Sequence, residues 1–266
     1  ERTAAYHHLS EGQPDMCAEL YAALYQVLRA QNAAFGMELP PDFDALPKSA
    51  DLPDPLKFAD GRPARDANDW RARRAEIREL FEHWVTGTFP AKPAIAKVVP
   101  VDETRGDGFV TRNVRLEFGP GGRGSLRVQV TLPTKGGPFP VLICPNLPGW
   151  ASMLIRRGYA SAGYAGNDFM DDTAPLADLY PEYDFATLPR RAWAAQLVVD
   201  HLLTLPEIDP ARIAIFGYSR DGKMATIAAA FDERIAAVIA GSTGVGGVLP
   251  WRLAGEYGMG EGIEST

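Results

Sequence analysis

One stretch, residues 212–223 (RIAIFGYSRDGK), constrains the fold of this chain more than any other. Its first part, residues 213–216, is a short apolar run with the β-branched and aromatic content of a buried strand. A sharp turn with Ser219 at its centre follows, and the Ala-rich segment 224–231 then favours a helix. A strand, a tight Gly-x-Ser turn and a helix in this order form a nucleophile elbow, which projects the serine hydroxyl beyond the carboxyl edge of a sheet.

The glycine spacing of this turn differs from the usual Gly-x-Ser-x-Gly pattern. The second glycine is Gly222, one place later than usual, and Asp221 occupies the usual glycine position. A Gly-x-Ser sequence also has a simpler explanation, because serine is a favoured N-cap residue at the start of a helix. The strand before the turn and the helix after it favour the elbow, with Ser219 as the candidate nucleophile.

Residues 217–223 (GYSRDGK) resemble the Gly-Cys-Ser-Arg-Asn-Gly-Lys segment of glucuronoyl esterases, and related bacterial esterases carry Gly-His-Ser-Arg-x-Gly-Lys. Residues 232–235 (DERI) and 244–247 (GVGG) resemble the segments that follow the elbow in that family. The resemblance covers about residues 52–255, and Ser-Arg-x-Gly-Lys is its most specific part. It implies an α/β-hydrolase that cleaves the ester between lignin alcohols and the glucuronic acid side groups of xylan.

The resemblance also implies roles for Arg220 and Lys223, and position along the chain suggests one for Trp150. Arg220 matches an arginine that donates hydrogen bonds to the oxyanion, and a surface salt bridge is the alternative. Lys223 matches a lysine that contacts the sugar ring, and a solvated lysine one turn into a helix fits equally well. Trp150 ends the segment 146–150, which follows an apolar strand and is expected to border the oxyanion hole, so Trp150 is a candidate for substrate binding.

The pattern of the whole chain predicts an α/β-hydrolase fold, with a mainly parallel sheet, antiparallel N-terminal strands and helices on both faces. Two segments of alternating polarity, 110–118 and 126–132, flank a Gly-rich turn and predict an antiparallel pair. Further strands are predicted at 139–144, 159–165, 213–216 and 236–240, and helices at 15–35, 66–86, 150–157, 190–205 and 224–231.

Two regions are expected along the chain. Residues 1–90 are expected to form N-terminal helices and an irregular strap, and residues 91–266 the N-terminal part of the α/β-hydrolase domain through the elbow. An acidic loop spans residues 165–189. Its carboxylates match no EF-hand spacing, so a solvated surface loop is expected there rather than a calcium site.

The formal net charge of −7 argues against nucleic acid or an anionic membrane as a partner. The expected partner is a small-molecule or polysaccharide ester. The four histidines show no metal-ligand spacing, so no metal or other cofactor is expected.

Cys17 and Cys144 fall in predicted buried elements, which favours two buried thiols over a disulfide. The chain begins at Glu1 without Met or a signal peptide, which suits a processed secreted or periplasmic protein and also a chain whose ends were not seen.

A serine nucleophile needs a histidine base and a carboxylate, and both follow the serine in this fold. No histidine follows Ser219 in the sequence. By the same resemblance, Ser242 stands where the family has its glutamate, and Gly241 replaces a glutamine that helps to hold the uronate. We therefore expect a second chain or a missing C-terminal segment to carry the catalytic acid and the histidine.

Two classes of function follow from these patterns. The first is a serine carboxylesterase that acts on carbohydrate-linked esters of the glucuronoyl or acetyl type. It would use an acyl-enzyme mechanism with Ser219 as nucleophile and Arg220 at the oxyanion hole. The second is a non-catalytic relative that keeps the fold for binding or assembly. An ester assay with a Ser219→Ala control separates the two.

Overall fold

The computed structural model describes residues 52–145, 151–244 and 246–248, together with a few residues between Ala23 and Ala34. The chain divides into two compact units, Glu1–Arg73 and Arg74–Thr266. This division lies before the boundary expected near residue 90. All residues discussed for the site below belong to the second unit.

In the first unit, the described residues between Ala23 and Ala34 are helical, in agreement with the helix predicted over 15–35. Helix α3 (Ala67–Phe81) begins at Asp66, whose Oδ1 accepts hydrogen bonds from the amides of Asn68 and Asp69 at 2.8 and 2.9 Å. It crosses into the second unit, where the π-helical turn η2 (Glu82–Thr86) continues it. Together the two cover the predicted helix 66–86.

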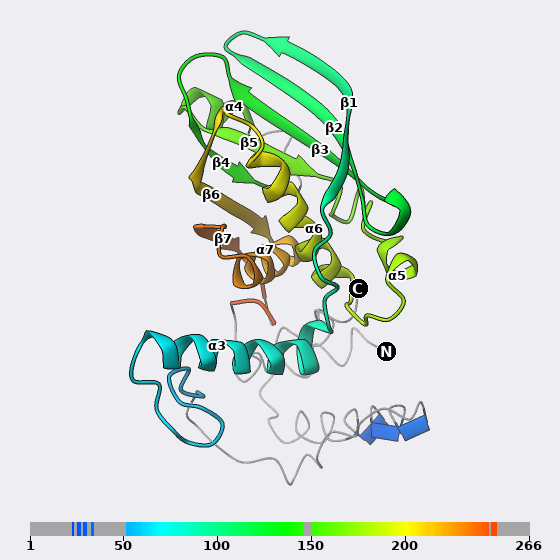
Figure 1. Cartoon of the computed structure of the whole chain (residues 1–266), viewed down its shortest axis with the longest axis vertical. Coiled ribbons are helices and arrows are strands. Elements are labelled where there is room, and N and C mark those ends of the chain that lie inside the picture. Colours follow the sequence, from blue (N-terminus) through cyan, green and yellow to red (C-terminus); the bar gives the residue numbers. More distant parts are fainter. Residues whose placement is uncertain are drawn as a thin grey trace, which may run out of the picture. The chain divides into compact units, whose positions relative to one another are not determined.

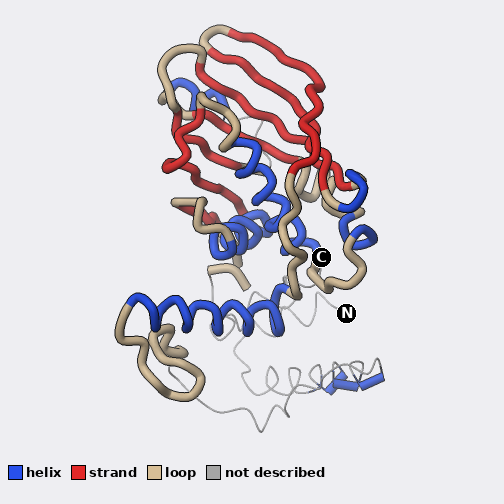
Figure 2. The backbone as a smooth tube through the Cα atoms, in the orientation of Figure 1, coloured by secondary structure: helices blue, strands red, loops and turns tan. Residues whose placement is uncertain are grey.

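The second unit is built on one seven-stranded sheet in the order β1-β2-β3-β5-β4-β6-β7 (Figure 1). Its strands are β1 (Ile95–Gly106), β2 (Phe109–Phe118), β3 (Gly124–Pro133), β4 (Phe139–Ile143), β5 (Ala160–Tyr164), β6 (Ile208–Tyr218) and β7 (Ala237–Gly241). The pairs among β1, β2, β3 and β5 are antiparallel, and those among β5, β4, β6 and β7 are parallel. Figure 2 shows the strands in red as one continuous twisted layer. The antiparallel N-terminal strands and the parallel remainder confirm the predicted α/β-hydrolase architecture.

The burial of the strands follows their residue patterns. In β3, the alternate residues Leu126, Val128, Val130 and Leu132 are at most 2% exposed. The continuous apolar run of β4 is almost entirely buried, as expected of a strand with neighbours on both sides. Cys144, directly after β4, is also buried as predicted, whereas Cys17 lies outside the described residues.

The helices of the second unit include α4 (Ala151–Arg156), α5 (Leu176–Leu179), α6 (Thr187–Leu202) and α7 (Arg220–Phe231). Helix α6 supplies the centre of the core. Its Trp193 packs against the rings of Phe118, Tyr180 and Phe185 with centroid separations of 5.6–6.1 Å. The Trp193 Nε1–H donates to the Pro90 carbonyl at 2.9 Å, so this large side chain is buried with its polar group satisfied. Among the described residues, no helix is both long and apolar enough to span a bilayer.

Candidate active site

Ser219 lies at the carboxyl edge of the sheet, where the strand order changes direction. β5 lies on one side of β4 and β6 on the other. In open α/β sheets, such a switch point leaves a crevice outside the carboxyl ends of the strands, and ligands bind there. Ser219 follows β6 directly, and the segment 146–150 follows β4. The topology therefore places the candidate nucleophile at the edge where this kind of sheet binds ligands.

The backbone of Ser219 has a conformation that serine rarely adopts, with φ 55° and ψ −124°. Its amide donates to the Gly241 carbonyl of β7 at 2.8 Å, and its carbonyl accepts from the Gly222 amide at 3.0 Å. A strained residue of this kind costs about 1–3 kcal/mol and persists only where its surroundings impose it. The Ser219 hydroxyl makes no capping hydrogen bond with α7. The capping explanation is therefore wrong, because the Ser219 hydroxyl does not cap α7.

Two glycines let β6 and α7 approach as closely as this turn requires. A Cβ atom at Gly217 would lie 1.9 Å from the Asp221 carbonyl oxygen, so no larger residue fits there. A Cβ atom at Gly222 would lie 2.7 Å from Thr243 Cγ2 and 3.1 Å from the Gly217 carbonyl oxygen. The unusual position of the second glycine thus marks the point where α7 contacts the end of β6 and the segment after β7.

Arg220 is the first residue of α7. The first amides of a helix lack an intrahelical acceptor, and within the described part of the chain the Arg220 amide donates no backbone hydrogen bond. Its guanidinium Nη2 donates to the Asp168 carboxylate. The salt bridge named as the alternative role for Arg220 is therefore present. This salt bridge occupies one nitrogen of the Arg220 guanidinium, and the described residues offer no partner to the other two, Nε and Nη1.

Asp168 belongs to a network that joins the acidic loop to α6. Arg191 donates from Nη1 to Asp168 and from Nε to Asp171, both at 2.8 Å, and its side chain is only 6% exposed. In the same loop, Asp172 pairs with Arg127 of β3. The expectation of a solvated loop therefore holds for Asp168, which is exposed, whereas Asp171 and Asp172 are partly buried. The sequence did not predict that each of these three carboxylates pairs with an arginine. The described residues contain no group of three or more possible metal ligands.

Sequence reasoning missed Asp168, Asp171 and Arg191 as parts of the site. One signal was available: Asp168 follows the carboxyl end of β5 by four residues, at the same sheet edge as Ser219. The pairing itself was not visible, because these residues are far from Arg220 in the sequence.

Asp221, at the usual glycine position of the elbow, is a half-buried carboxyl group. Burial, and then the negative charge of Asp168, raise its pKa to about 6, although Arg191 and Arg220 act in the opposite direction. The elbow therefore carries a carboxyl group that changes its charge in a mildly acidic range.

The structure describes one of the two predicted substrate-binding residues, Lys223, but not the other, Trp150. Lys223 is fully buried, so the alternative of a solvated lysine is wrong. The sugar contact suggested for it stays a prediction. Trp150 lies outside the described residues.

His201 lies at the opposite end of the sheet from the elbow. Helix α6 links the parallel strands β5 and β6, so it runs back against their direction and begins at their carboxyl edge. Arg191 is near that start, and His201 is ten residues, or about 15 Å, further along. His201 is 5% exposed, and burial lowers its pKa. This position agrees with a structural role for His201 rather than that of a base for Ser219.

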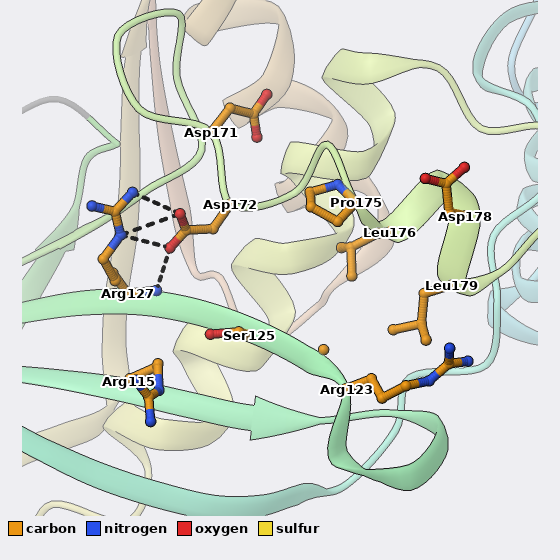
Figure 3. Close-up of a pocket in the computed structure, with 11 residues that line it drawn as sticks. Arg115, Arg123, Ser125, Arg127, Asp171, Asp172, Pro175, Leu176, Asp178 and Leu179 are labelled. Atoms are coloured by element: carbon orange, nitrogen blue, oxygen red, sulfur yellow. Dashed lines mark hydrogen bonds and ion pairs between the residues drawn. The ribbon is translucent and has the colours of Figure 1, made fainter.

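A pocket of about 540 Å³ lies beside the acidic loop, between β2, β3 and α5 (Figure 3). Its lining includes Arg127 and Asp172, which the figure shows joined by several dashed lines. Neither Ser219 nor Arg220 lines it. Its charged groups are mixed in sign and largely paired, so the pocket adds no catalytic group to the elbow.

Comparisons with known proteins agree on one family. A family model described as "Glucuronyl esterase, fungi" matches residues 119–265, just over half of the chain. A 4-O-methyl-glucuronoyl methylesterase from Phanerochaete carnosa is 31% identical over 245 residues, which cover 87% of this chain and 58% of that protein. The chain spans about half the length of the curated relatives it matches. No comparison supports a second chain as the source of the missing acid and histidine.

Solved structures share the fold. A glucuronoyl esterase from Solibacter usitatus superposes with a TM-score of 0.65 at 22% identity, over 77% of this chain and 67% of that one. A mutant glucuronoyl esterase from Sporotrichum thermophile, in complex with methyl 4-O-methyl-β-D-glucopyranuronate, superposes with a TM-score of 0.58 at 26% identity, over 77% of this chain and 56% of that one. Since the family match spans the elbow and both strands beside it, this chain belongs to the glucuronoyl esterase family.

Proposed function

We propose that this protein is a serine carboxylesterase that hydrolyses esters of glucuronic acid units, with Ser219 as its nucleophile. One observation carries the proposal: Ser219 is held in a strained conformation at the carboxyl edge of the sheet, and its hydroxyl does not cap α7. A protein that used this serine only to start a helix would gain from the cap and would have no need of the strain.

The proposed reaction proceeds in two stages. Ser219 Oγ attacks the ester carbonyl, its proton passes through a base to the departing alcohol, and an acyl-enzyme forms. Water then attacks the acyl-enzyme, which releases the uronate and returns the proton to Ser219. The Arg220 amide and the two guanidinium nitrogens that have no partner among the described residues supply donors for the negative oxygen that develops in both stages.

The proposal also names the acyl group of the substrate, a glucuronoyl group. The relatives are methylesterases of 4-O-methyl-glucuronate, and a solved relative binds a methyl glucuronate ester. We extend that substrate class to this protein, with Lys223 and Trp150 as sugar-binding residues, and with a polysaccharide or small-molecule ester as the partner. A secreted or periplasmic location suits an enzyme with a polysaccharide substrate.

The test is hydrolysis of methyl 4-O-methyl-glucuronate, followed by acid release at constant pH, beside an acetyl ester as the competing substrate. Ser219→Ala should lower kcat by at least about 10⁴-fold, as loss of a serine nucleophile does elsewhere. The matched control is Ser242→Ala, which removes the hydroxyl of the other serine with a positive φ. Equal turnover by the Ser219→Ala variant and the wild type would refute the proposal. The assay uses the protein together with the segment expected to carry the acid and the histidine. Binding of the uronate without any hydrolysis by that wild type would favour the non-catalytic alternative.

Arg220 allows a second test of the same proposal. Arg220→Ala should lower kcat by about 10²–10³-fold, the usual effect of removing one oxyanion donor. Arg212→Ala is the control, since Arg212 is an exposed residue of β6, the strand before the elbow, and pairs with Asp209. Unchanged turnover in the Arg220→Ala variant would show that Arg220 forms an ion pair with Asp168 but is not an oxyanion donor.

A further inference from the structure

Arg220 has a long side chain whose direction must be fixed if it is to act beside Ser219. An unrestrained arginine loses about 2 kcal/mol of rotamer freedom when it is held in one geometry. The Arg220 side chain is 39% exposed, so packing alone does not hold it. Its one hydrogen-bond partner among the described residues is the Asp168 carboxylate, which takes Nη2.

Asp168 is itself held from two directions. Its second carboxylate oxygen accepts from Arg191 Nη1 at 2.8 Å, and Arg191 is fixed in turn by Asp171. The neighbouring residue Asn167 is 1% exposed and donates to the Pro145 carbonyl at 2.6 Å, just beyond the end of β4. Asn167 Oδ1 also accepts from the amides of Phe169 and Met170, which closes the backbone around Asp168.

One carboxylate oxygen of Asp168 thus accepts from the buried Arg191, and the other accepts from the exposed Arg220. Arg191 and Asn167 fix the carboxylate at the switch point, and the carboxylate fixes one nitrogen of Arg220. Within the described part of the chain, Nε and Nη1 of Arg220 have no acceptor, so they can donate to a substrate. We infer that Asp168 is a positioning residue that holds the Arg220 guanidinium beside Ser219. This inference rests on the proposed function of Ser219 and Arg220.

The inference predicts an ordered series of kinetic effects. Asp168→Asn should lower kcat by about 10- to 100-fold with a small change in KM, because it removes the alignment of a donor and not a substrate contact. Asp168→Glu keeps the charge and should recover part of that loss. Asp171→Asn, which loosens the support of Arg191 and the contacts of Asp171 with Thr173 but leaves both bonds of Asp168 in place, should have a smaller effect. Asp178→Asn is the control, because Asp178 is an exposed carboxylate of the same loop, in α5, with no ion pair among the described residues.

A double-mutant cycle separates positioning from a general structural role. If Asp168 acts through Arg220, Asp168→Asn should change kcat little in an Arg220→Ala background. Additive effects of the two substitutions on log kcat would overturn the inference, and so would unchanged kcat in Asp168→Asn alone.

A measurement that does not depend on hydrolysis keeps the inference separate from the proposed function. The Nη signals of Arg220 in nitrogen-15 NMR, assigned with Arg220→Lys, should shift and exchange faster in Asp168→Asn than in the wild type. Unchanged Arg220 signals would overturn the inference whatever the activity. Hydrolysis that is unaffected by Ser219→Ala would instead refute the proposed function, and the NMR result would then decide whether Asp168 holds Arg220.

Discussion

The two sides of Ser219 are built in different ways. On one side, β6, α7 and β7 meet through backbone atoms: the Ser219 amide bonds to the Gly241 carbonyl, and Gly217 contacts the Asp221 carbonyl. On the other side, charged side chains of the acidic loop and α6 hold Arg220. We call these the backbone side and the ion-pair side. The backbone side tolerates no added atom, whereas the ion-pair side depends on charges that pH and substitution can alter.

The largest expected effect comes from the backbone side. Gly217→Ala would place a methyl group 1.9 Å from the Asp221 carbonyl oxygen, so the turn would have to open. We expect a loss of at least about 3 kcal/mol in the free energy of unfolding, typical of severe backbone conflict. Denaturant titration measures it. The control is Gly163→Ala in β5, where the added atom would lie 3.4 Å from its nearest neighbour, an ordinary contact. Equal loss in both variants would show that the close approach at Gly217 is not what limits the turn.

The next effect concerns the buried member of the ion-pair side. Arg191→Met leaves the carboxylates of Asp168 and Asp171 without their shared partner, and we expect a loss of about 3 kcal/mol in unfolding free energy. Arg212→Met, which breaks the exposed pair with Asp209, should cost less than about 1 kcal/mol. Similar losses in the two variants would mean that burial does not distinguish the two pairs.

Asp221 joins the two sides, and its effect should depend on pH. The fold raises the pKa of this carboxyl to about 6, so the folded state binds its proton more tightly than the unfolded chain does. Its contribution to stability is therefore fully present at low pH and is lost as pH rises to about 6. Asp221→Asn should stabilise the protein by about 1 kcal/mol above pH 6, after allowance for partial exposure, and give no gain below pH 4. Thermal unfolding across pH 4–8, beside Asp178→Asn, checks this. A gain that does not change with pH would rule out the buried charge as its cause.

The smallest expected effect is the strain of Ser219 itself. Ser219→Gly places at φ 55° a residue that adopts positive φ without a steric penalty. We expect a gain of about 1 kcal/mol in unfolding free energy. Ser125→Gly in β3, where no strain is relieved, should lower stability instead. A loss of stability in both variants would show that the positive φ of Ser219 does not destabilise the folded state.

The same division explains what the sequence could predict. The glycines, the apolar strand and the Ala-rich helix of the backbone side are neighbours in the chain, and local pattern was enough to predict the turn and Ser219 as its central residue. Most of the strands and helices were predicted for the same reason, but α5 lies inside the stretch expected to be a loop, and no bounds were predicted for β1. The ion-pair side joins Asp168, Arg191 and Arg220, which only the folded sheet brings together, so the loop was expected to be solvated. The burial of Lys223 was equally hidden, because the segments around it are distant in sequence.

The bond from the Ser219 amide to β7 has a consequence for the order of folding. The turn is fully closed only when β7, which follows α7 in the chain, has joined the sheet beside β6. The unfavourable dihedral angles of Ser219 would then be imposed after the main barrier to folding has been crossed. Relief of that strain should therefore slow unfolding and leave the refolding rate nearly unchanged. In kinetic terms, we expect the candidate nucleophile to be assembled last and to be the first part released, and measured folding and unfolding rates of Ser219→Gly test this.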